Sequence, residues 1–342
     1  MAQRTPKENY LGIGYGIQPD YVPLYTMFGE GPHGETATKS CGPMIFPMDY
    51  FGKPEGNDMW GVPYVANAET GFASIPKPGA FILDDITRWS EVVKAPAMPE
   101  GIDWELMAQR DYEKANIDRT QSAVMMNAGL MPFEQVMAFM GFNEGLCAFF
   151  EEPDAVKELI HYMVDFVLPV IENGIEYYKP DILYILDDTA TQSNPFLSVE
   201  MYRDILKPAY AKMTKLAMER GIPVQFHNCG RCEDFIDDMI DFGVRFWDPA
   251  QTSNDLLGIQ QKYKGKIAVC GGWDYNPGRP WGEVPEDEVR QSVRDSLDKY
   301  AIGGQYAFCG GALTQFGDEA GMRVNGWVQD EAYTYGRNFY NK

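Results

Sequence analysis

The stretch Ile222-Pro223-Val224-Gln225-Phe226-His227-Asn228-Cys229-Gly230 decides how this chain is interpreted. A short apolar run that ends in polar residues and precedes a helical pattern predicts a buried strand of a parallel sheet. Because side chains alternate along a strand, His227 and Cys229 are expected to point to the same side. Imidazole nitrogen and thiolate sulfur are ligands that zinc prefers. The stretch therefore predicts a strand whose carboxyl end carries two candidate zinc ligands.

Other short apolar runs of the same kind alternate with helical patterns along the chain. The further strand candidates are residues 21–25, 60–65, 123–126, 181–186, 244–247, 267–270 and 306–309. The helical patterns are residues 154–178, 198–220, 233–242 and 286–300. Pro23 and Pro63 weaken the first two strand candidates. Strands that alternate with helices predict parallel βαβ units, and eight of them predict one α/β domain, a (β/α)8 TIM barrel over residues 1–342.

Residues 29–121 differ from the rest of the chain because they are rich in Pro and Gly and have few periodic stretches. We interpret this segment as a long irregular N-terminal excursion that covers the mouth of the barrel. The stretch Gly12-Ile13-Gly14-Tyr15-Gly16 has neither a preceding strand nor the GxGxxG spacing, so we do not expect it to bind phosphate.

Composition excludes several classes of partner. The 342 residues include 29 basic and 50 acidic ones, which give a formal net charge of -21. Nucleic acids and anionic membranes require clustered Lys and Arg, so we expect neither as a partner. No run of 18 apolar residues and no apolar N-terminal segment occur, so we expect neither a membrane span nor a secretory signal. Six scattered cysteines are too few for a disulfide framework, which favours a cytoplasmic location.

The carboxyl ends of the later strand candidates carry reactive side chains, which a barrel would bring to one mouth. Among the cysteines, Cys309 and Cys270 both end a strand before a Gly-Gly pair, so spacing leaves both open as a third zinc ligand, with Cys41 a weaker candidate. We expect Cys232 to face away on the first turn of a helix. Cys147 is expected in the core, on a helix.

Two acidic residues, Asp187 and Asp188, follow another strand candidate. Adjacent strand residues point to opposite sides, so one of them is expected to face the barrel axis as a proton donor or acceptor. Aromatic and Met side chains also lie near the predicted strand ends: Tyr25, Trp60, Met125, Met126, Trp247 and Trp273. They would suit an apolar, planar substrate, although core packing explains each of them equally well.

Several of these motifs together resemble the uroporphyrinogen decarboxylase superfamily, in particular its zinc- and corrinoid-dependent methyltransferase branch. The matching residues are Ile185-Leu186-Asp187-Asp188, Gln192, the segment 202–208, His227-x-Cys229-Gly230, Asp248-Pro249-Ala250-Gln251 and Cys309, and the segment 7–23 is also similar. The resemblance implies a (β/α)8 barrel with Zn²⁺ bound by His227, Cys229 and Cys309. The distance of about eighty residues from the HxCG motif favours Cys309 over Cys270. Substrate, water or a carboxylate would hold the fourth position.

The resemblance also implies an activity. We expect an aryl methyl ether O-demethylase component that moves a methyl group from a methoxylated aromatic to the cobalt(I) of a corrinoid, releasing a phenol. Asp187 and Asp188 are the expected catalytic residues, and Gln192, Trp247 and Gln251 the expected substrate-binding residues. The chain has no Asp-x-His-x-x-Gly motif for a corrinoid, so a separate corrinoid protein is the expected partner. A homodimer is compatible with the sequence.

Three alternatives stay open at this point. The first is the same branch acting as a methylcobamide:thiol methyltransferase. The second is a decarboxylase of the uroporphyrinogen type, which would need basic residues for several carboxylates. The third is a barrel that acts as a binding module, with a structural zinc closed by four protein ligands.

Overall fold

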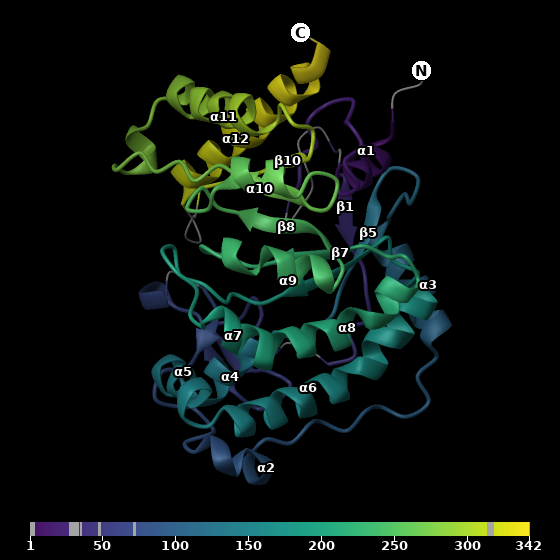
Figure 1. Cartoon of the computed structure of the whole chain (residues 1–342), viewed down its shortest axis with the longest axis vertical. Helices are drawn as coiled ribbons and strands as arrows, with labels where there is room; N and C mark the ends of the chain where they lie inside the picture. Colours follow the sequence, from purple (N-terminus) through teal and green to yellow (C-terminus); the bar gives the residue numbers. More distant parts are fainter. Residues whose placement is uncertain are drawn as a thin grey trace.

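A parallel β-sheet of seven strands forms the centre of the computed structural model, which describes residues 4–26, 34, 36–46, 49–70, 73–312 and 318–341. The strand order is β1-β5-β6-β7-β8-β9-β10 (Figure 1). The strands are β1 (Thr38–Ser40), β5 (Ala123–Asn127), β6 (Ile182–Leu186), β7 (Val224–His227), β8 (Val244–Ala250), β9 (Ala268–Gly272) and β10 (Tyr306–Cys309). Every ladder within it is parallel, which places all the carboxyl ends at one edge.

Helices follow the strands and pack on the outside of the sheet, with one exception. They are α1 (Pro6–Ile13), α2 (Trp89–Val92), α3 (Trp104–Ala115), α4 (Pro132–Met140), α5 (Phe142–Glu151), α6 (Pro153–Asn173), α7 (Val199–Met201), α8 (Lys207–Glu219), α9 (Ile236–Asp241), α10 (Leu256–Lys262), α11 (Glu286–Tyr300) and α12 (Glu319–Arg337). The exception is α1, which precedes the sheet and places Tyr10 beside Gln225 of β7 and Cys270 of β9. Figure 1 shows α11 and α12 at one end of the long axis and α2, α5 and α6 at the other. None of the described helices is both long and apolar enough to cross a membrane.

The four expected helices are confirmed, and three of them contain π-helical or 3-10 turns that periodicity does not predict. The pattern over 154–178 is α6 continued by a π-helical turn, Gly174–Tyr178. The pattern over 198–220 is α7, a second π-helical turn (Tyr202–Leu206) and α8, and the Ser198 hydroxyl accepts the N–H of Met201 as the N-cap. Residues 233–242 are a 3-10 turn followed by α9.

The six strand candidates from residue 123 onward are confirmed, whereas the two Pro-containing ones form no strand of this sheet among the described residues. Residues 60–65 supply only β3 (Pro63–Val65), which belongs to a separate antiparallel sheet with β2 (Glu55–Asn57) and β4 (Ile75–Pro76). Residues 21–25 make a single parallel bridge, from Leu24 to Phe308 of β10. The described residues therefore form a curled seven-stranded sheet, and no ladder among them joins segment 21–25 to β1.

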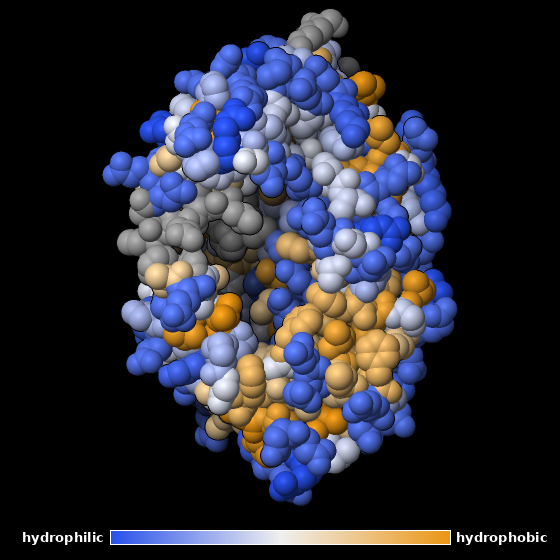
Figure 2. Space-filling model, turned by 90° about the vertical axis from the view of Figure 1, so that its left-hand side faces the viewer, coloured by the Kyte–Doolittle hydropathy of each residue, from blue (hydrophilic) through white to orange (hydrophobic). Residues whose placement is uncertain are grey.

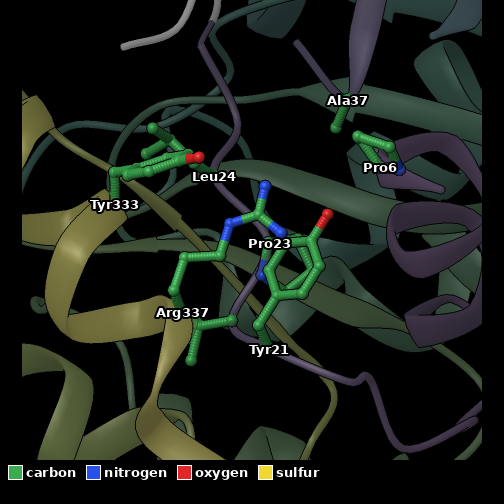
Figure 3. Close-up of a pocket in the computed structure, with 8 residues that line it drawn as sticks. Pro6, Tyr21, Pro23, Leu24, Ala37, Tyr333 and Arg337 are labelled. Carbon is green, nitrogen blue, oxygen red and sulfur yellow. The ribbon is translucent and has the colours of Figure 1, made fainter. Parts of the chain in front are cut away.

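A small pocket lies between segment 21–25 and the residue before β1. It is lined by Pro6, Tyr21, Val22, Pro23, Leu24, Ala37, Tyr333 and Arg337 (Figure 3). The Arg337 guanidinium lies 3.7 Å from the centre of the Tyr21 ring, a cation–π contact that attaches the end of α12 to segment 21–25.

The segment expected to be irregular, 29–121, carries β1, the small antiparallel sheet, α2 and α3. Its loop after β2 is organised by Asp58, which accepts the N–H groups of Trp60 at 2.9 Å and Val62 at 2.8 Å. The other Asp58 oxygen accepts Gln135 Nε2 of α4 at 2.9 Å. This hydrogen bond ties the small sheet to the helix that begins beside the candidate site.

Candidate metal centre

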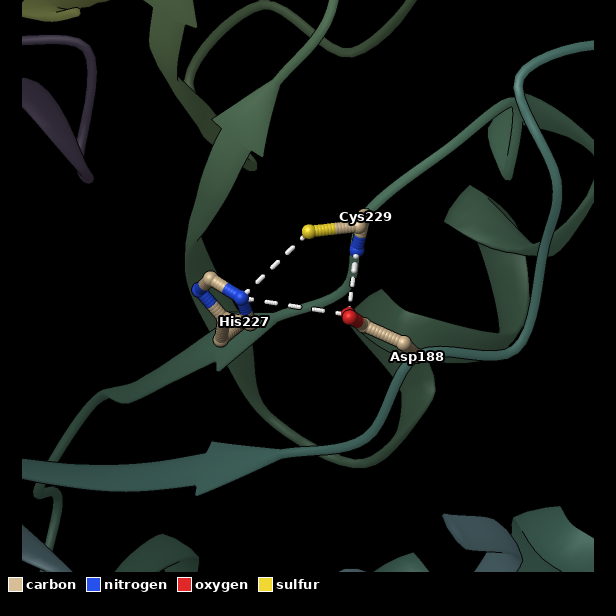
Figure 4. A group of neighbouring side chains, drawn as sticks. All are labelled: Asp188, His227 and Cys229. Atoms are coloured by element: carbon tan, nitrogen blue, oxygen red, sulfur yellow. Dashed lines mark hydrogen bonds and ion pairs between the residues drawn. The ribbon is translucent and has the colours of Figure 1, made fainter. Parts of the chain in front are cut away.

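The side chains of Asp188, His227 and Cys229 converge at the carboxyl edge of the sheet (Figure 4). His227 is the last residue of β7, and Asp188 lies two residues beyond the end of β6, the neighbouring strand. His227 Nε2 lies 3.5 Å from Cys229 Sγ and 3.8 Å from Asp188 Oδ1. One ligand atom from each residue lies within 4.8 Å of the others, and all three residues are half-buried.

The loop that carries Cys229 is held by backbone hydrogen bonds to side chains of neighbouring strands. The Cys229 N–H donates to Asp188 Oδ1 at 2.8 Å, and the Gly230 N–H donates to Gln251 Oε1 at 2.5 Å. Gly230 has a φ of +88°, and a Cβ there would lie 2.5 Å from the carbonyl oxygens of Ala190 and Thr191. Only glycine fits this turn, so Gly230 of the HxCG motif sets the direction of the Cys229 side chain.

The donor set fits a zinc ion. Zn–N and Zn–S bonds of about 2.0–2.1 and 2.3 Å, at a tetrahedral angle, place the two ligand atoms about 3.5 Å apart. The observed 3.5 Å between His227 Nε2 and Cys229 Sγ matches that separation. Nitrogen, sulfur and oxygen ligands together favour Zn²⁺ over Mg²⁺ or Ca²⁺, which prefer oxygen alone. Asp188 supplies the carboxylate that no sequence motif could place.

Both ring nitrogens of His227 have polar neighbours. Its Nδ1 lies 2.9 Å from Asp248 Oδ1, on the neighbouring strand β8. Burial alone lowers the pKa of His227, but the hydrogen bonds to Asp248 and Cys229 outweigh it and raise this pKa to about 11. Without a metal, the site therefore holds a proton in the position that a cation would take.

Asp187, expected to be catalytic, is fully buried, and its carboxylate is hydrogen-bonded to the start of α4. Its carboxylate accepts the N–H groups of Phe133 at 2.6 Å and Glu134 at 2.9 Å, and the hydroxyl of Tyr210 at 2.7 Å. These amides are unpaired donors of the first turn of α4, where the N-cap residue Met131 makes no side-chain bond. Asp187 thus caps α4 from another strand, and of the two adjacent carboxylates only Asp188 joins the cluster.

Glu134, on the first turn of α4, is the residue that sequence reasoning missed. Its half-buried carboxyl has no side-chain hydrogen bond among the described residues. Burial and the neighbouring Asp187 and Asp188 raise its pKa to about 8, although His227 acts in the opposite direction. No motif marks it, because its position depends on how α4 docks against β6. A carboxyl that holds its proton near neutral pH is a candidate proton donor.

The raised pKa of Glu134 predicts a pH dependence of stability in the metal-free chain. The folded state holds the Glu134 proton more tightly than the unfolded state, so the contribution of Glu134 to stability is greatest below about pH 4.5 and falls as the pH rises towards about 8. The full shift would correspond to about 5 kcal/mol, and we expect a smaller loss of about 2–3 kcal/mol over that range because solvent screens the half-buried carboxyl. Urea unfolding at several pH values in the presence of a chelator measures it. Glu134→Gln should flatten the profile, and an unchanged slope in that variant would contradict the assignment.

The three expected substrate-binding residues have different environments. Gln192 is exposed on the loop after β6. Trp247 is fully buried, and its indole N–H donates to the carbonyl of Asn228 at 3.0 Å. It therefore helps to hold the loop 228–230 that carries Cys229. Gln251 holds the Gly230 N–H. Of the three, only Gln192 is placed at the surface with a free side chain among the described residues.

The cysteines divide into those near the site and those in other roles. Cys309, at the end of β10, is half-buried, and burial together with Asp248 and Cys229 raises the pKa of its thiol. Its sulfur lies outside the 4.8 Å cluster.

The other cysteines have different environments. Cys270 is buried, with its sulfur 3.4 Å from the Tyr10 hydroxyl. Cys232 is buried with its thiol towards the Asn228 carbonyl, facing away as expected. Cys41 is buried outside the sheet beside Tyr178. Cys147 lies on α5 but is exposed, so its expected core position is wrong.

The carboxyl ends of the strands open onto a hollowed face. The β8 arrow in Figure 1 points to the side that faces the viewer in Figure 2, where the surface is hollowed. Apolar side chains gather in the lower half of that face (Figure 2). The candidate metal centre therefore belongs to the open end of the sheet.

Comparisons with known proteins agree with this architecture. No curated protein matches the chain. Among solved structures, a methyltransferase from Methanosarcina mazei aligns with a TM-score of 0.57 at 14% identity, covering 97% of this chain and 100% of the other, which shows a shared fold. The family model for uroporphyrinogen decarboxylase (URO-D) matches residues 116–312, more than half of the chain, including β5 to β10 and the candidate metal centre. The chain belongs to the uroporphyrinogen decarboxylase (URO-D) family.

Proposed function

We propose that this protein is a zinc-dependent methyltransferase that moves the methyl group of an aryl methyl ether to the cobalt(I) of a separate corrinoid protein. The observation that carries the proposal is the nitrogen, sulfur and oxygen cluster of His227, Cys229 and Asp188 at the open end of the sheet. A decarboxylase has no need for such a ligand set. The fold shared with a methyltransferase supports the same choice.

His227 and Cys229 would hold the metal, and we propose Cys309 as the third ligand on the grounds of the family resemblance. Burial raises the pKa of its thiol, and Asp248 and Cys229 raise it further, which supports a position for Cys309 near both residues. Asp188 would occupy the fourth position until a substrate oxygen replaces it. When bound, Zn²⁺ supplies Lewis acidity at that oxygen. We also propose that Leu24, through its bridge to Phe308, marks the eighth position of the barrel.

The transfer breaks the bond between the methyl carbon and the ether oxygen and forms a bond between that carbon and cobalt. The aryl oxygen keeps the electron pair and must take up a proton to leave as a phenol. We assign that proton to Glu134, whose carboxyl lies close enough to Asp188 and His227 for each to affect its pKa. The role of Glu134 is to deliver the proton as the aryl oxygen departs.

An aromatic wall beside Glu134 suits an aromatic substrate. The rings of Tyr50 and Tyr64 stack with centres 4.1 Å apart, and both tyrosines are half-buried. Burial and Asp58 raise the pKa of each of them, and Glu134 adds to this effect, which supports a position of the pair on the side of Glu134. A planar methoxyarene could lie against this wall with its ether oxygen towards Asp188.

The proposal is tested by supplying the zinc-loaded protein with a methoxylated benzoate and a corrinoid protein reduced to cobalt(I). We expect release of one phenol per methylcobalt formed. Chromatography measures the phenol, and the absorbance of the corrinoid measures the methylcobalt. In parallel, the methylated corrinoid protein and a thiol are supplied. Formation of a methyl thioether without any phenol release would replace the proposal with the thiol methyltransferase. Turnover of a porphyrinogen in the presence of a chelator would support the decarboxylase instead.

A further inference from the structure

A chain of buried polar side chains runs from the metal centre into the interior of the sheet. Asp248 is fully buried, and the register of β7 and β8 pairs it with His227. A register shift in β8 follows at once, between Trp247 and Ala250, so β8 is irregular directly at this pair. Bulges next to functional sites commonly re-aim a side chain.

Both oxygens of the Asp248 carboxylate are occupied. Oδ1 lies 2.9 Å from His227 Nδ1 and accepts the Tyr184 hydroxyl at 3.2 Å, while Oδ2 accepts Gln225 Nε2 at 2.6 Å. The Gln225 amide is held in this orientation because a flipped amide would place its Oε1 against Asp248 Oδ2, two acceptors without a hydrogen between them, while its present Oε1 accepts the Tyr10 hydroxyl at 2.9 Å. Since Gln225 and Tyr184 already donate to Asp248, the carboxylate acts as an acceptor and His227 Nδ1 must carry a hydrogen.

The negative charge of the Asp248 carboxylate is paired with His227 of the candidate metal centre. Among the described residues, the ion pair of Asp248 is with His227, and no Lys or Arg pairs with it. An unpaired buried carboxylate is costly, so the opposite charge has to come from whatever His227 carries. With hydrogen on Nδ1, the Nε2 lone pair faces Cys229 and Asp188, where a divalent cation would supply that charge.

We propose that Asp248 is a positioning residue for the metal: it selects Nε2 of His227 as the ligand atom and fixes the plane of the ring. Gln225 and Tyr184 hold Asp248, and Tyr10 of α1 holds Gln225. This inference rests on the proposed metal site but not on the methyl donor. Outer-sphere carboxylates of this kind orient a ligating imidazole and strengthen its bond to the ion.

The test compares zinc affinity, by competition with a chelating dye, in the wild type and three variants. Asp248→Asn is expected to lower the affinity about 10- to 100-fold. Tyr184→Phe removes one hydrogen bond and is expected to lower it roughly 3- to 10-fold, without the risk of misfolding that a change at Asp248 carries. Asp238→Asn is the matched control, because Asp238 is equally buried but pairs with Arg203 and Lys207 on the helical side of the fold. It should leave the affinity unchanged.

A second measurement reads the ring directly. The chain has only three histidines, so ¹⁵N labelling of histidine resolves the His227 ring nitrogens in the zinc-loaded protein. We expect Nδ1 to carry hydrogen and Nε2 to shift on metal binding. Coordination through Nδ1, or wild-type zinc affinity in both Asp248→Asn and Tyr184→Phe, would overturn the inference while leaving the methyltransferase proposal standing. A wild-type chain that binds no zinc would overturn both.

Discussion

Replacing Cys229 with serine is expected to lower zinc affinity and methyl transfer by at least about 100-fold, because the loop loses its thiolate ligand. Cys229 Sγ and His227 Nε2 are separated by the distance that tetrahedral zinc requires. The hydroxyl of serine is a poorer ligand for zinc and keeps its proton at neutral pH. Metal analysis after dialysis against a weak chelator measures the loss, together with single-turnover assays of methyl transfer.

Cys147→Ser is the matched control for this substitution. Cys147 is a free, exposed cysteine on α5, far in sequence from the metal loop. Its replacement should leave both zinc content and activity at the level of the wild type. If Cys229→Ser retained one zinc per chain with full affinity, the metal centre would have to be assigned to other residues.

Replacing Asp187 with alanine is expected to destabilise the fold by about 3 kcal/mol. The substitution removes the cap on the amides of Phe133 and Glu134, worth about 1 kcal/mol. It also leaves the buried hydroxyl of Tyr210 without its acceptor, which costs about 1–3 kcal/mol. Urea unfolding of the metal-free chain at pH 8 measures the change.

The control is Asp103→Ala at the start of α3. Asp103 also caps a helix, accepting the N–H of Leu106 at 2.9 Å, but the hydrogen bond is exposed. Its loss should cost only about 1 kcal/mol, because water replaces the cap. A destabilisation by Asp187→Ala no larger than that of the control, combined with a complete loss of activity, would return Asp187 to the role of catalytic residue expected from the sequence.

The later strands and the metal loop were predictable from the sequence because their signals are local. Apolar runs of four to five residues mark β6, β9 and β10, and β7 differs only by Gln225. His227 and Cys229 do lie together as expected, although β7 ends at His227 and the turn at Gly230, rather than strand alternation, directs Cys229. The early part of the sheet lacks such signals. β1 is Thr-Lys-Ser, three residues without an apolar run, and it is recognisable only by its ladder with β5.

The remaining site residues depend on contacts between segments far apart in the sequence. Glu134 reaches the centre only because Asp187 caps α4, and Asp248 reaches His227 only through the register of β7 with β8. Residues 60–65 show the opposite case. Their Val and aromatic residues predict a strand, but Pro63 and the Asp58 turn direct them into a small antiparallel sheet. Local propensity therefore predicts that this segment is a strand but not which strand it pairs with.

The hydrogen bond between Asp58 and Gln135 has a consequence for how new specificities could arise. It attaches the small sheet to α4 from outside the range that the family model matches, whereas every hydrogen bond that holds Cys229 and His227 lies inside that range. The small antiparallel sheet and the proposed metal-binding loop are thus held by separate sets of contacts. If residues 49–83 contact the substrate, exchanging them between relatives, with Asp58 retained, should change substrate preference and leave zinc affinity as it is.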